Sequence, residues 1–242
     1  MRILVTNDDG IGSPALVRLA EWARKLGEVT VVAPLVEQSG KSHSIDFRNA
    51  FEIKCIDFLE GCEAYSVDST PADCVRFGIT GLDRQYDIVF SGVNRGYNIG
   101  EDISYSGTIG AIFEAKRLGV KAIALSTDFD SFENAFAELD GVYELIVRNR
   151  LLDTADLLNV NFPTTASRGV VITRQGSRFY SDRFVSCGGD MYMQVGQPVP
   201  HYGDDISTDI GAIQSGYVSI TPLTYTKTDL AAYEQLKDKP LK

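Results

Sequence analysis

The sequence has few of the residues that build thiolate metal sites or disulfide-rich folds. It contains four cysteines, none of them in a CxxC pair, and only two histidines. These counts argue against a structural zinc cluster, and they predict reduced, mostly buried thiols in a cytosolic protein. No apolar run reaches the ~18 residues of a membrane span. The chain begins directly with strand-like sequence, so we expect no signal peptide, no membrane span and a cytoplasmic location.

Basic charge is also scarce. The chain has 23 Lys and Arg against 33 Asp and Glu, a formal net charge of −10. Such a surface lacks the positive field that attracts phosphate backbones, which argues against polymeric nucleic acid or a membrane as a partner. A small phosphorylated substrate is still compatible, because local charge can oppose net charge. The 242 residues suggest one large domain, or one domain with an elaboration.

The first two thirds of the sequence alternate strand and helix patterns. A strand is expected at 2–6, a helix from Ser13-Pro14 that ends by Gly27, and a second strand at 28–34. A strand, a helix and a strand within about 30 residues form a βαβ unit of a parallel sheet. The alternation continues with strands expected at 65–67, 87–90, 121–126 and 157–162, and with helices starting at Thr70-Pro71 and spanning 108–118 and 132–148. The predicted fold class is α/β, with a Rossmann-like, doubly wound, mostly parallel sheet in three αβα layers.

The pattern changes after Pro163. Strands are expected at 169–174, 184–195 and 216–222, separated by glycine- and aspartate-rich loops without crossover helices, and a short helix at 229–236. We therefore divide the chain into a core over residues 1–163 and a β-rich, antiparallel extension with a terminal helix over residues 164–242.

Polar groups follow three of the expected parallel strands. Asp8 and Asp9 follow the first, Ser39 follows the second, and Asn94 follows the strand at 87–90. The carboxyl ends of parallel strands meet at one edge of a sheet. Two adjacent carboxylates repel by roughly 1 kcal/mol in water and by more in a drier cleft. If the loops converge, Asp8, Asp9, Ser39 and Asn94 form a set of hard oxygen ligands suited to Mg²⁺ or Mn²⁺.

The Asp8-Asp9 pair imposes a condition on the backbone. Neighbouring residues of a strand point to opposite faces. Both carboxylates can serve one ion only if the strand has already ended and Gly10 lets the chain turn. The sequence therefore predicts a loop, rather than strand, over residues 7–10.

The segment Ser106-Gly107-Thr108 supplies a complementary anion site. It precedes an expected helix, so its backbone N–H groups and hydroxyls form a phosphate cradle at a helix N-terminus. A metal ion and this helix end together suit a phosphate monoester attacked by water. No Cys or His is placed as a nucleophile, so direct attack by water is preferred, with an aspartyl intermediate on Asp8 as the alternative.

Each piece also has an ordinary structural explanation. Asp8-Asp9-Gly10 is a common turn sequence, and Ser106 is a common helix N-cap. Asn94 and Asn98, close to glycines, are residues that tolerate left-handed turn positions. Only their joint placement at successive strand ends favours a site.

Two better-known phosphate motifs nearly match. Gly10, Gly12 and Ala15 form a GxGxxA dinucleotide fingerprint, but Asp8 and Asp9 would repel the pyrophosphate. Gly40-Lys41-Ser42 ends like a P-loop. That motif needs glycine where Leu35 stands and a helix where residues 44–47 alternate like a strand.

Three charged or titratable residues near these loops each have two alternative roles. His43 is a candidate general acid or phosphate contact, or a polar loop residue. Lys41 and Arg95 are candidate substrate contacts or solvated side chains.

Six segments make the chain recognisable: 3–16 (ILVTNDDGIGSPAL), 33–45 (APLVEQSGKSHSI), 69–75 (STPADCV), 91–115 (SGVNRGYNIGEDISYSGTIGAIFEA), 159–163 (NVNFP) and 216–223 (GYVSITPL). Over essentially its whole length the sequence resembles the SurE family of metal-dependent acid phosphatases acting on nucleoside monophosphates. The segment after Ser39 departs from the frequent GASNS pattern.

The resemblance implies a 5′-nucleotidase that also takes 3′-nucleotides, with short polyphosphate as a further substrate. It implies one divalent metal ion per subunit, Mg²⁺ or Mn²⁺. The family assembles as homodimers and homotetramers by exchanging C-terminal elements, which fits the extension after Pro163. The implied site residues are the metal ligands Asp8, Asp9, Ser39 and Asn94, the phosphate-binding Asn94, Asn98, Ser106, Gly107 and Thr108, and the catalytic Asp8, Asp9, Asn98, Ser106 and Thr108.

A rival hypothesis from another class is a non-catalytic nucleotide-binding or oligomerising protein on the same fold. Phosphate release with and without EDTA separates this hypothesis from an enzyme.

Overall fold

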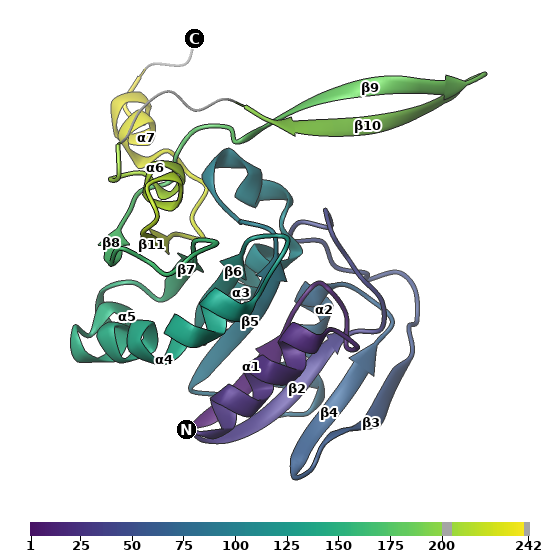
Figure 1. The fold of residues 1–242 in the computed structure, drawn as a ribbon. Helices are drawn as coiled ribbons and strands as arrows, with labels where there is room; N and C mark the ends of the chain where they lie inside the picture. Colours follow the sequence, from purple (N-terminus) through teal and green to yellow (C-terminus); the bar gives the residue numbers. More distant parts are fainter. Residues whose placement is uncertain (200–204, 240–242) are drawn as a thin grey trace.

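The computed structural model describes residues 1–199 and 205–239 (Figure 1). Its strands are β1 (Arg2–Thr6), β2 (Glu28–Pro34), β3 (Ile53–Leu59), β4 (Cys62–Val67), β5 (Ile88–Arg95), β6 (Lys121–Thr127), β7 (Leu157–Asn161), β8 (Val170–Ile172), β9 (Tyr180–Gly188), β10 (Met191–Pro198) and β11 (Val218–Leu223). Nine of them form one sheet in the order β3-β4-β2-β1-β5-β6-β7-β11-β8, and β9 and β10 form a separate hairpin.

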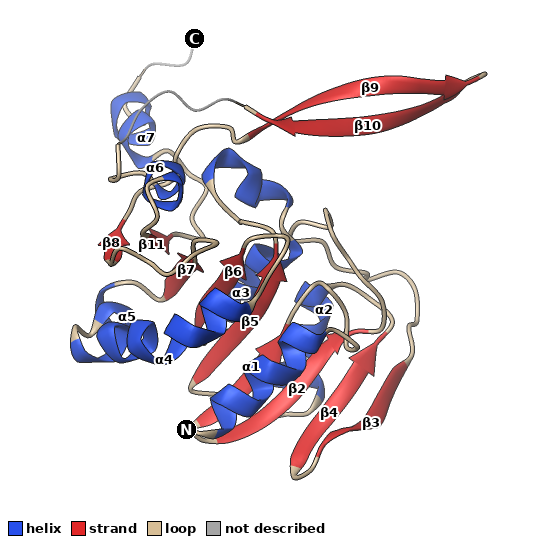
Figure 2. Cartoon of the chain, viewed as in Figure 1, coloured by secondary structure: helices blue, strands red, loops and turns tan. Residues whose placement is uncertain are grey.

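Helices cover both faces of the large sheet (Figure 2). They are α1 (Pro14–Arg24), α2 (Pro71–Arg76), α3 (Gly107–Arg117), α4 (Glu133–Arg148), α5 (Leu151–Thr154), α6 (Asp209–Gln214) and α7 (Leu230–Leu236). A 3₁₀ helix at Gly100–Tyr105 leads into α3, and a π-helical turn at Phe77–Gly81 follows α2.

The alternation of side chains along β1 explains the three layers. Ile3 and Val5 belong to the core beneath α1 and α4, whereas Leu4 belongs to the core beneath α2 and α3. Both faces of this strand are buried, as its continuous apolar sequence predicts. Strands β4, β2, β1, β5, β6 and β7 are mutually parallel. The predicted α/β fold class with a doubly wound, mostly parallel sheet is therefore confirmed.

Trp22 on α1 lies in the first of these cores. Its ring makes edge-to-face contacts with Phe90 and Tyr143, and its indole N–H donates to Asp140 at 2.6 Å. Burying an indole requires a partner for its N–H, and α4 provides that partner across the layer.

The structure corrects several local expectations. The sequence did not predict β3, an edge strand whose side chains are mostly half-buried or exposed. The single strand expected at 184–195 is wrong, since the chain reverses at Gly188-Gly189, both with positive φ, to form β9 and β10. A helix, α6, lies between β10 and β11, where none was expected. Residues 44–47 are not a strand.

The segment after Pro163 divides between the sheet and the hairpin. Strand β11 pairs antiparallel with β7 and parallel with β8, which extends the main sheet. The hairpin of β9 and β10 projects from the body as a long arm (Figure 1). The antiparallel element expected after the core is thus present as this separate hairpin.

The thiols are less buried than expected. Cys62 and Cys74 are buried, but Cys55 and Cys187 are exposed, and all four are free. In residues 1–199 and 205–239 no helix is long and apolar enough to cross a membrane.

Candidate functional site

The sheet topology brings the predicted strand ends together. Strand β1 has β2 on one side and β5 on the other, and all three run parallel. The chain builds the sheet outward from β1 through β2 and β4, then returns to place β5 on the opposite side. The switch point therefore lies between β1 and β5, where ligands bind in such sheets.

A cavity of about 480 Å³ opens at this edge. A neighbouring cavity of about 260 Å³ contains Asp9 and Glu37 and shares Ser39 and Arg95 with the larger one. The larger cavity is lined by five of the predicted site residues: Asp8, Ser39, Asn94, Asn98 and Ser106. The three segments thus converge as expected, but Asn94 lies within β5, which extends to Arg95, rather than in a loop after a strand at 87–90.

The Asp8-Asp9 loop has the shape that the sequence required. Strand β1 ends at Thr6, and Gly10 turns the chain with a φ of +95°. A Cβ at Gly10 would lie 3.1 Å from the carbonyl carbon of Val36. The loop after β2 is fastened to this turn, because the N–H of Gln38 donates to the carbonyl of Asp8 at 2.7 Å.

Asp8 is held by the first turn of α3. The Thr108 hydroxyl donates to Oδ1 at 2.7 Å, and the Thr108 backbone N–H donates to Oδ2 at 3.2 Å. Gly107 permits this approach, since a Cβ there would lie 2.9 Å from the Asp8 Cβ. Asp8 is only 4% exposed, and this burial raises its pKa while the two hydrogen bonds from Thr108 oppose the rise.

Asp9, unlike Asp8, has a carboxylate oxygen without a hydrogen-bond partner within the part of the chain that the structure describes. Its Oδ2 is buried and has no hydrogen-bond partner among the described residues. Burial and then the charge of Asp8 raise the pKa of Asp9 to about 7, although the backbone amide and charge of Arg95 lower it. A buried, unpaired carboxylate is costly unless a cation neutralises it.

These residues fit a divalent cation. Two carboxylates repel each other at the edge of a cavity, and one of their buried oxygens lacks a partner. Ser39 and Asn94 add a hydroxyl and an amide oxygen, which are hard ligands of the kind Mg²⁺ and Mn²⁺ take. Among residues 1–199 and 205–239, no three His, Cys, Asp or Glu side chains cluster as metal ligands, and the predicted set contains only two such residues.

Hydrogen bonds orient the two neutral members of this set. The Ser39 hydroxyl donates to Glu37 Oε1 at 2.6 Å, so its oxygen lone pairs are left for another partner. The Asn94 Nδ2 donates to the carbonyl of Gly96 at 2.8 Å, which assigns Oδ1 as the ligating end of that amide.

Asn98 is fixed in place beside them. Its Nδ2 donates to the Ser126 hydroxyl at 2.8 Å, and its backbone N–H donates to Asn161 Oδ1 at 2.9 Å. Asn159 and Asn161 both donate to its carbonyl. One N–H of the Asn98 side chain is then left for a ligand in the cavity.

The three residues of the expected phosphate cradle differ in their partners. Ser106 caps α3 by accepting from the N–H of Ile109 at 3.2 Å, so its own hydroxyl proton is left for a ligand. The Gly107 N–H has no acceptor among the described residues. Thr108 has already given its hydroxyl and its amide to Asp8. Ser106 and Gly107 therefore keep anion-binding donors, while Thr108 holds Asp8.

Several lining residues were not singled out by the sequence. Tyr97, Asp102 and Tyr105 come from the segment between β5 and α3, and Tyr180 and Asp182 come from the start of β9. The carboxylate of Asp102 accepts from the N–H groups of Phe179 and Tyr180 at 2.9 and 2.8 Å, which anchors the base of the hairpin at the cavity. A hairpin about 80 residues away in sequence gave no local signal for this contact.

Of the three residues whose roles the sequence left undecided, only Arg95 lies at these cavities. Arg95 lines both cavities, and its guanidinium lies 4.8 Å from the ring centre of Phe129. His43 and Lys41 line neither cavity. His43 instead contacts Glu114 on α3, with 2.8 Å between Nε2 and Oε2.

Comparison with known proteins gives one consistent relationship. A sequence model of the family described as "Survival protein SurE" matches residues 3–182. The "5′-nucleotidase SurE" of Thermosipho melanesiensis is 38% identical, covering 99% of this chain and 97% of that protein. The "5′-nucleotidase SurE 1" of Thermus thermophilus is 40% identical over 94% and 93% of the two chains. The crystal structure of a SurE protein from Aquifex aeolicus superposes with a TM-score of 0.80 at 34% identity, covering 98% of each chain.

Proposed function

The chain belongs to the SurE family, and from this we propose that it is a 5′-nucleotidase that hydrolyses nucleoside 5′-monophosphates to nucleoside and phosphate. The observation that carries the proposal is the Asp8-Asp9 pair beside the N-terminus of α3. It places unsatisfied negative charge next to amide and hydroxyl donors for an anion.

The proposed metal site consists of the Asp8 and Asp9 carboxylates, the Ser39 hydroxyl and the Asn94 amide oxygen, for one Mg²⁺ or Mn²⁺ per subunit. When bound there, the ion would polarise a phosphate oxygen and lower the pKa of a coordinated water. Asp8 is presented to the cavity by Thr108, and the tight turn at Gly10 brings Asp9 to the same edge.

The proposed phosphate site consists of donors that the fold has left unused. The Gly107 N–H, the Ser106 hydroxyl and the second N–H of the Asn98 side chain would bind phosphate oxygens and the charge that builds on them. Asn94 lies beside these donors. No Cys or His lines the cavity in the described part of the chain, which favours direct attack by water over a covalent intermediate.

The proposed substrate range is wider than nucleoside 5′-monophosphates. All the assigned donors address the phosphate group rather than the sugar. We therefore extend the proposal to nucleoside 3′-monophosphates and to the terminal phosphate of short polyphosphate. The base and sugar would lie toward Tyr97, Tyr105 and Tyr180 at the cavity wall.

Two further proposals concern the protein's surroundings. We propose that it forms a homodimer or homotetramer through the hairpin, because a two-stranded hairpin is only marginally stable alone and this one exposes Phe184, Val185, Tyr192 and Met193. The four free thiols, two of them exposed, support a reducing compartment such as the cytoplasm.

Phosphate release from AMP and GMP tests the enzyme directly. We expect turnover with Mg²⁺ or Mn²⁺, its loss with EDTA, and its restoration when metal is added back. Asp8→Asn and Asp9→Asn should each abolish the metal-dependent release. Absence of turnover from 5′- and 3′-nucleotides with any of Mg²⁺, Mn²⁺ or Co²⁺ would favour a non-catalytic nucleotide binder, and wild-type activity in the double variant would refute the site.

A further inference from the structure

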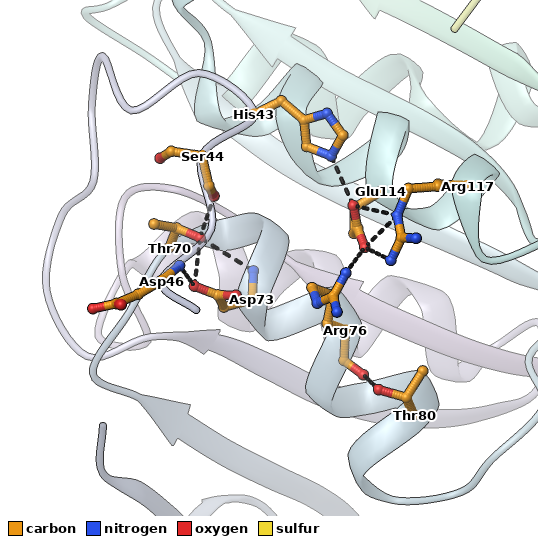
Figure 3. A network of polar contacts seen from close by, with 9 residues as sticks. All are labelled: His43, Ser44, Asp46, Thr70, Asp73, Arg76, Thr80, Glu114 and Arg117. Atoms are coloured by element: carbon orange, nitrogen blue, oxygen red, sulfur yellow. Dashed lines mark hydrogen bonds and ion pairs between the residues drawn. The ribbon is translucent and has the colours of Figure 1, made fainter. Parts of the chain in front are cut away.

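Glu114 is a buried carboxylate that joins three parts of the chain away from the cavity. It lies on α3, is 2% exposed, and contacts His43 at 2.8 Å, Arg76 at 2.9 Å and Arg117 at 2.7 Å. Figure 3 shows these side chains converging on its two oxygens, His43 from the loop after β2 and Arg76 from α2. Burial alone would raise the pKa of Glu114, but His43, Arg117 and Arg76 together lower it to about 2. The carboxylate is therefore charged at neutral pH.

The loop that carries His43 also carries Ser39, and it rests directly on α3. A Cβ at Gly110 would lie 2.2 Å from the carbonyl oxygen of Ser42 and 2.9 Å from the Cα of His43. The Ser42 N–H donates to the Tyr105 carbonyl at 2.9 Å, and its hydroxyl donates to the Ser104 carbonyl at 2.6 Å.

The backbone of this loop needs to be held. Ser42 has a φ of +57°, a left-handed conformation that non-glycine residues adopt only when their surroundings impose it. Neither a helix nor a strand covers residues 37–50. The path of the chain between Ser39 and His43 is therefore fixed by its contacts with α3 and with the 3₁₀ helix before it, and by the bond from the Gln38 N–H to the Asp8 carbonyl.

Helix α3 also positions Asp8 through Thr108 at its N-terminus. The helix thus contacts two of the three segments that provide the proposed metal ligands, the Asp8 loop through Thr108 and the Ser39 loop through Glu114. A displacement of the His43 loop would move the Ser39 hydroxyl relative to the Asp8 carboxylate, which Thr108 holds separately.

We propose that the Glu114–His43 contact is a positioning device for the metal site, which holds the loop so that the Ser39 hydroxyl faces Asp8 and Asn94. The inference rests on the proposed function in taking Ser39 as a metal ligand. His43 and Glu114 are positioning residues, since neither lines the cavity.

The contacts of Glu114 provide a matched control. Arg117→Gln and Arg76→Gln each remove one partner of Glu114 but leave its contact with His43. His43→Ala removes that contact together with the ring contacts of His43 with Phe113 and Tyr225. His43→Gln keeps a side-chain N–H that can donate to Glu114. A general loss of packing around Glu114 would affect all of these variants alike.

Mn²⁺ binding to the nucleotide-free protein, measured by calorimetry, is the primary test. His43→Ala should weaken binding about 10-fold, in the range seen when residues supporting metal ligands are removed. His43→Gln, Arg76→Gln and Arg117→Gln should stay within about twofold of wild type. In turnover assays of His43→Ala, half-saturating Mn²⁺ should rise, while kcat and the KM for AMP at saturating Mn²⁺ change little.

A double-mutant cycle assigns the effect to Ser39. Ser39→Ala with His43→Ala should bind Mn²⁺ no more weakly than Ser39→Ala alone, because His43 acts through that hydroxyl. Additive losses, unchanged binding in His43→Ala, or an equal loss in Arg117→Gln would overturn the inference. A wild-type protein that binds Mn²⁺ but does not hydrolyse nucleotides would refute the proposed function, and the binding cycle would still decide the role of His43.

Discussion

Thr108 gives both of its donors to Asp8, the hydroxyl to Oδ1 at 2.7 Å and the backbone N–H to Oδ2 at 3.2 Å. The pair spans 100 residues of sequence and joins the loop after β1 to the first turn of α3. Each donor lies on the positive end of a helix, which favours a carboxylate there. The carboxylate expected to bind metal is thus fixed by the helix expected to bind phosphate.

Replacing the hydroxyl of Thr108 tests this coupling. Thr108→Val keeps the shape and the backbone donor but removes the bond to Oδ1, which leaves Asp8 less well oriented. We expect half-saturating Mn²⁺ to rise about 10- to 100-fold, as for other groups that support metal ligands. Thr108→Ser retains the hydroxyl and should stay within about threefold of wild type. Equal effects of the two substitutions would point to packing rather than to the hydrogen bond.

The raised pKa of Asp9 predicts a pH-dependent instability of the metal-free protein. Burial and the charge of Asp8 bring its pKa to about 7 from its ordinary value of 3.8. Between these two values the folded state binds more protons than the unfolded chain. This contribution to stability is therefore present at low pH and is lost as pH rises toward and through 7.

Asp9→Asn removes this titration. Between pH 5 and pH 8, EDTA-treated wild type should lose about 1–2 kcal/mol of stability relative to Asp9→Asn, a value discounted for the partial exposure of Asp9. Urea unfolding at a series of pH values measures the difference. Saturating Mn²⁺ should stabilise wild type much more than the variant at pH 8, and parallel pH profiles in EDTA would contradict the assignment.

The sequence predicted which residues gather at this edge of the sheet because the relevant rule is topological. Asp8 and Ser39 follow β1 and β2, and Asn94 lies near the end of β5. These strands were expected to be parallel, so convergence at one edge could be predicted, on condition that they are neighbours, without knowledge of side-chain packing. The turn at Gly10 was also predictable, since two adjacent carboxylates reach one edge of the sheet only if the chain turns sharply. The partner of Thr108 could not be predicted, because the contact with Asp8 joins two elements that lie 100 residues apart in the sequence.

The parts that sequence reasoning missed depend on distant neighbours. Edge strand β3 has half-exposed side chains and pairs only with β4, so it lacks the continuous apolar run of a central strand. Tyr180 and Asp182 reach the cavity because Asp102 anchors the hairpin, a contact without any local pattern. His43 had a recognisable chemistry, but its partner Glu114 lies 71 residues away on another element.

The lowered pKa of Glu114 predicts sensitivity to acid. Its pKa is about 2 in the folded protein against an ordinary value of 4.5, because His43, Arg117 and Arg76 overcome the effect of burial. The stability that this shift contributes is present above pH 4.5 and is lost as pH falls toward 2. Glu114→Gln should be less stable at pH 7 by about 2–4 kcal/mol, because it leaves three partners unpaired.

The change of the free energy of unfolding with pH in acid distinguishes this electrostatic role of Glu114 from a role in packing. Between pH 4.5 and 2, Glu114→Gln should lose less stability than wild type, because the variant has no carboxylate to protonate there. Chemical unfolding across this range provides the comparison, with Arg117→Gln as an intermediate case that retains two of the three partners. A variant that is destabilised equally at every pH would show that Glu114 acts by shape alone.

The hairpin predicts the route of self-association. Successive residues of β9 and β10 point to opposite faces, and the face that includes Tyr180, Asp182 and Gln194 supplies residues to the cavity. Val185 and Met193 are directly paired on the other face, and both are exposed. Substituting both with serine should shift the protein to a smaller assembly in light scattering, since it removes apolar area without touching the cavity face.

Ser181→Ala, on the same face near the base of the hairpin, serves as the control. Half-saturating Mn²⁺ should be unchanged in the Val185→Ser/Met193→Ser variant, because none of the proposed metal ligands lies on the hairpin. An unchanged mass would show that a different surface joins the subunits.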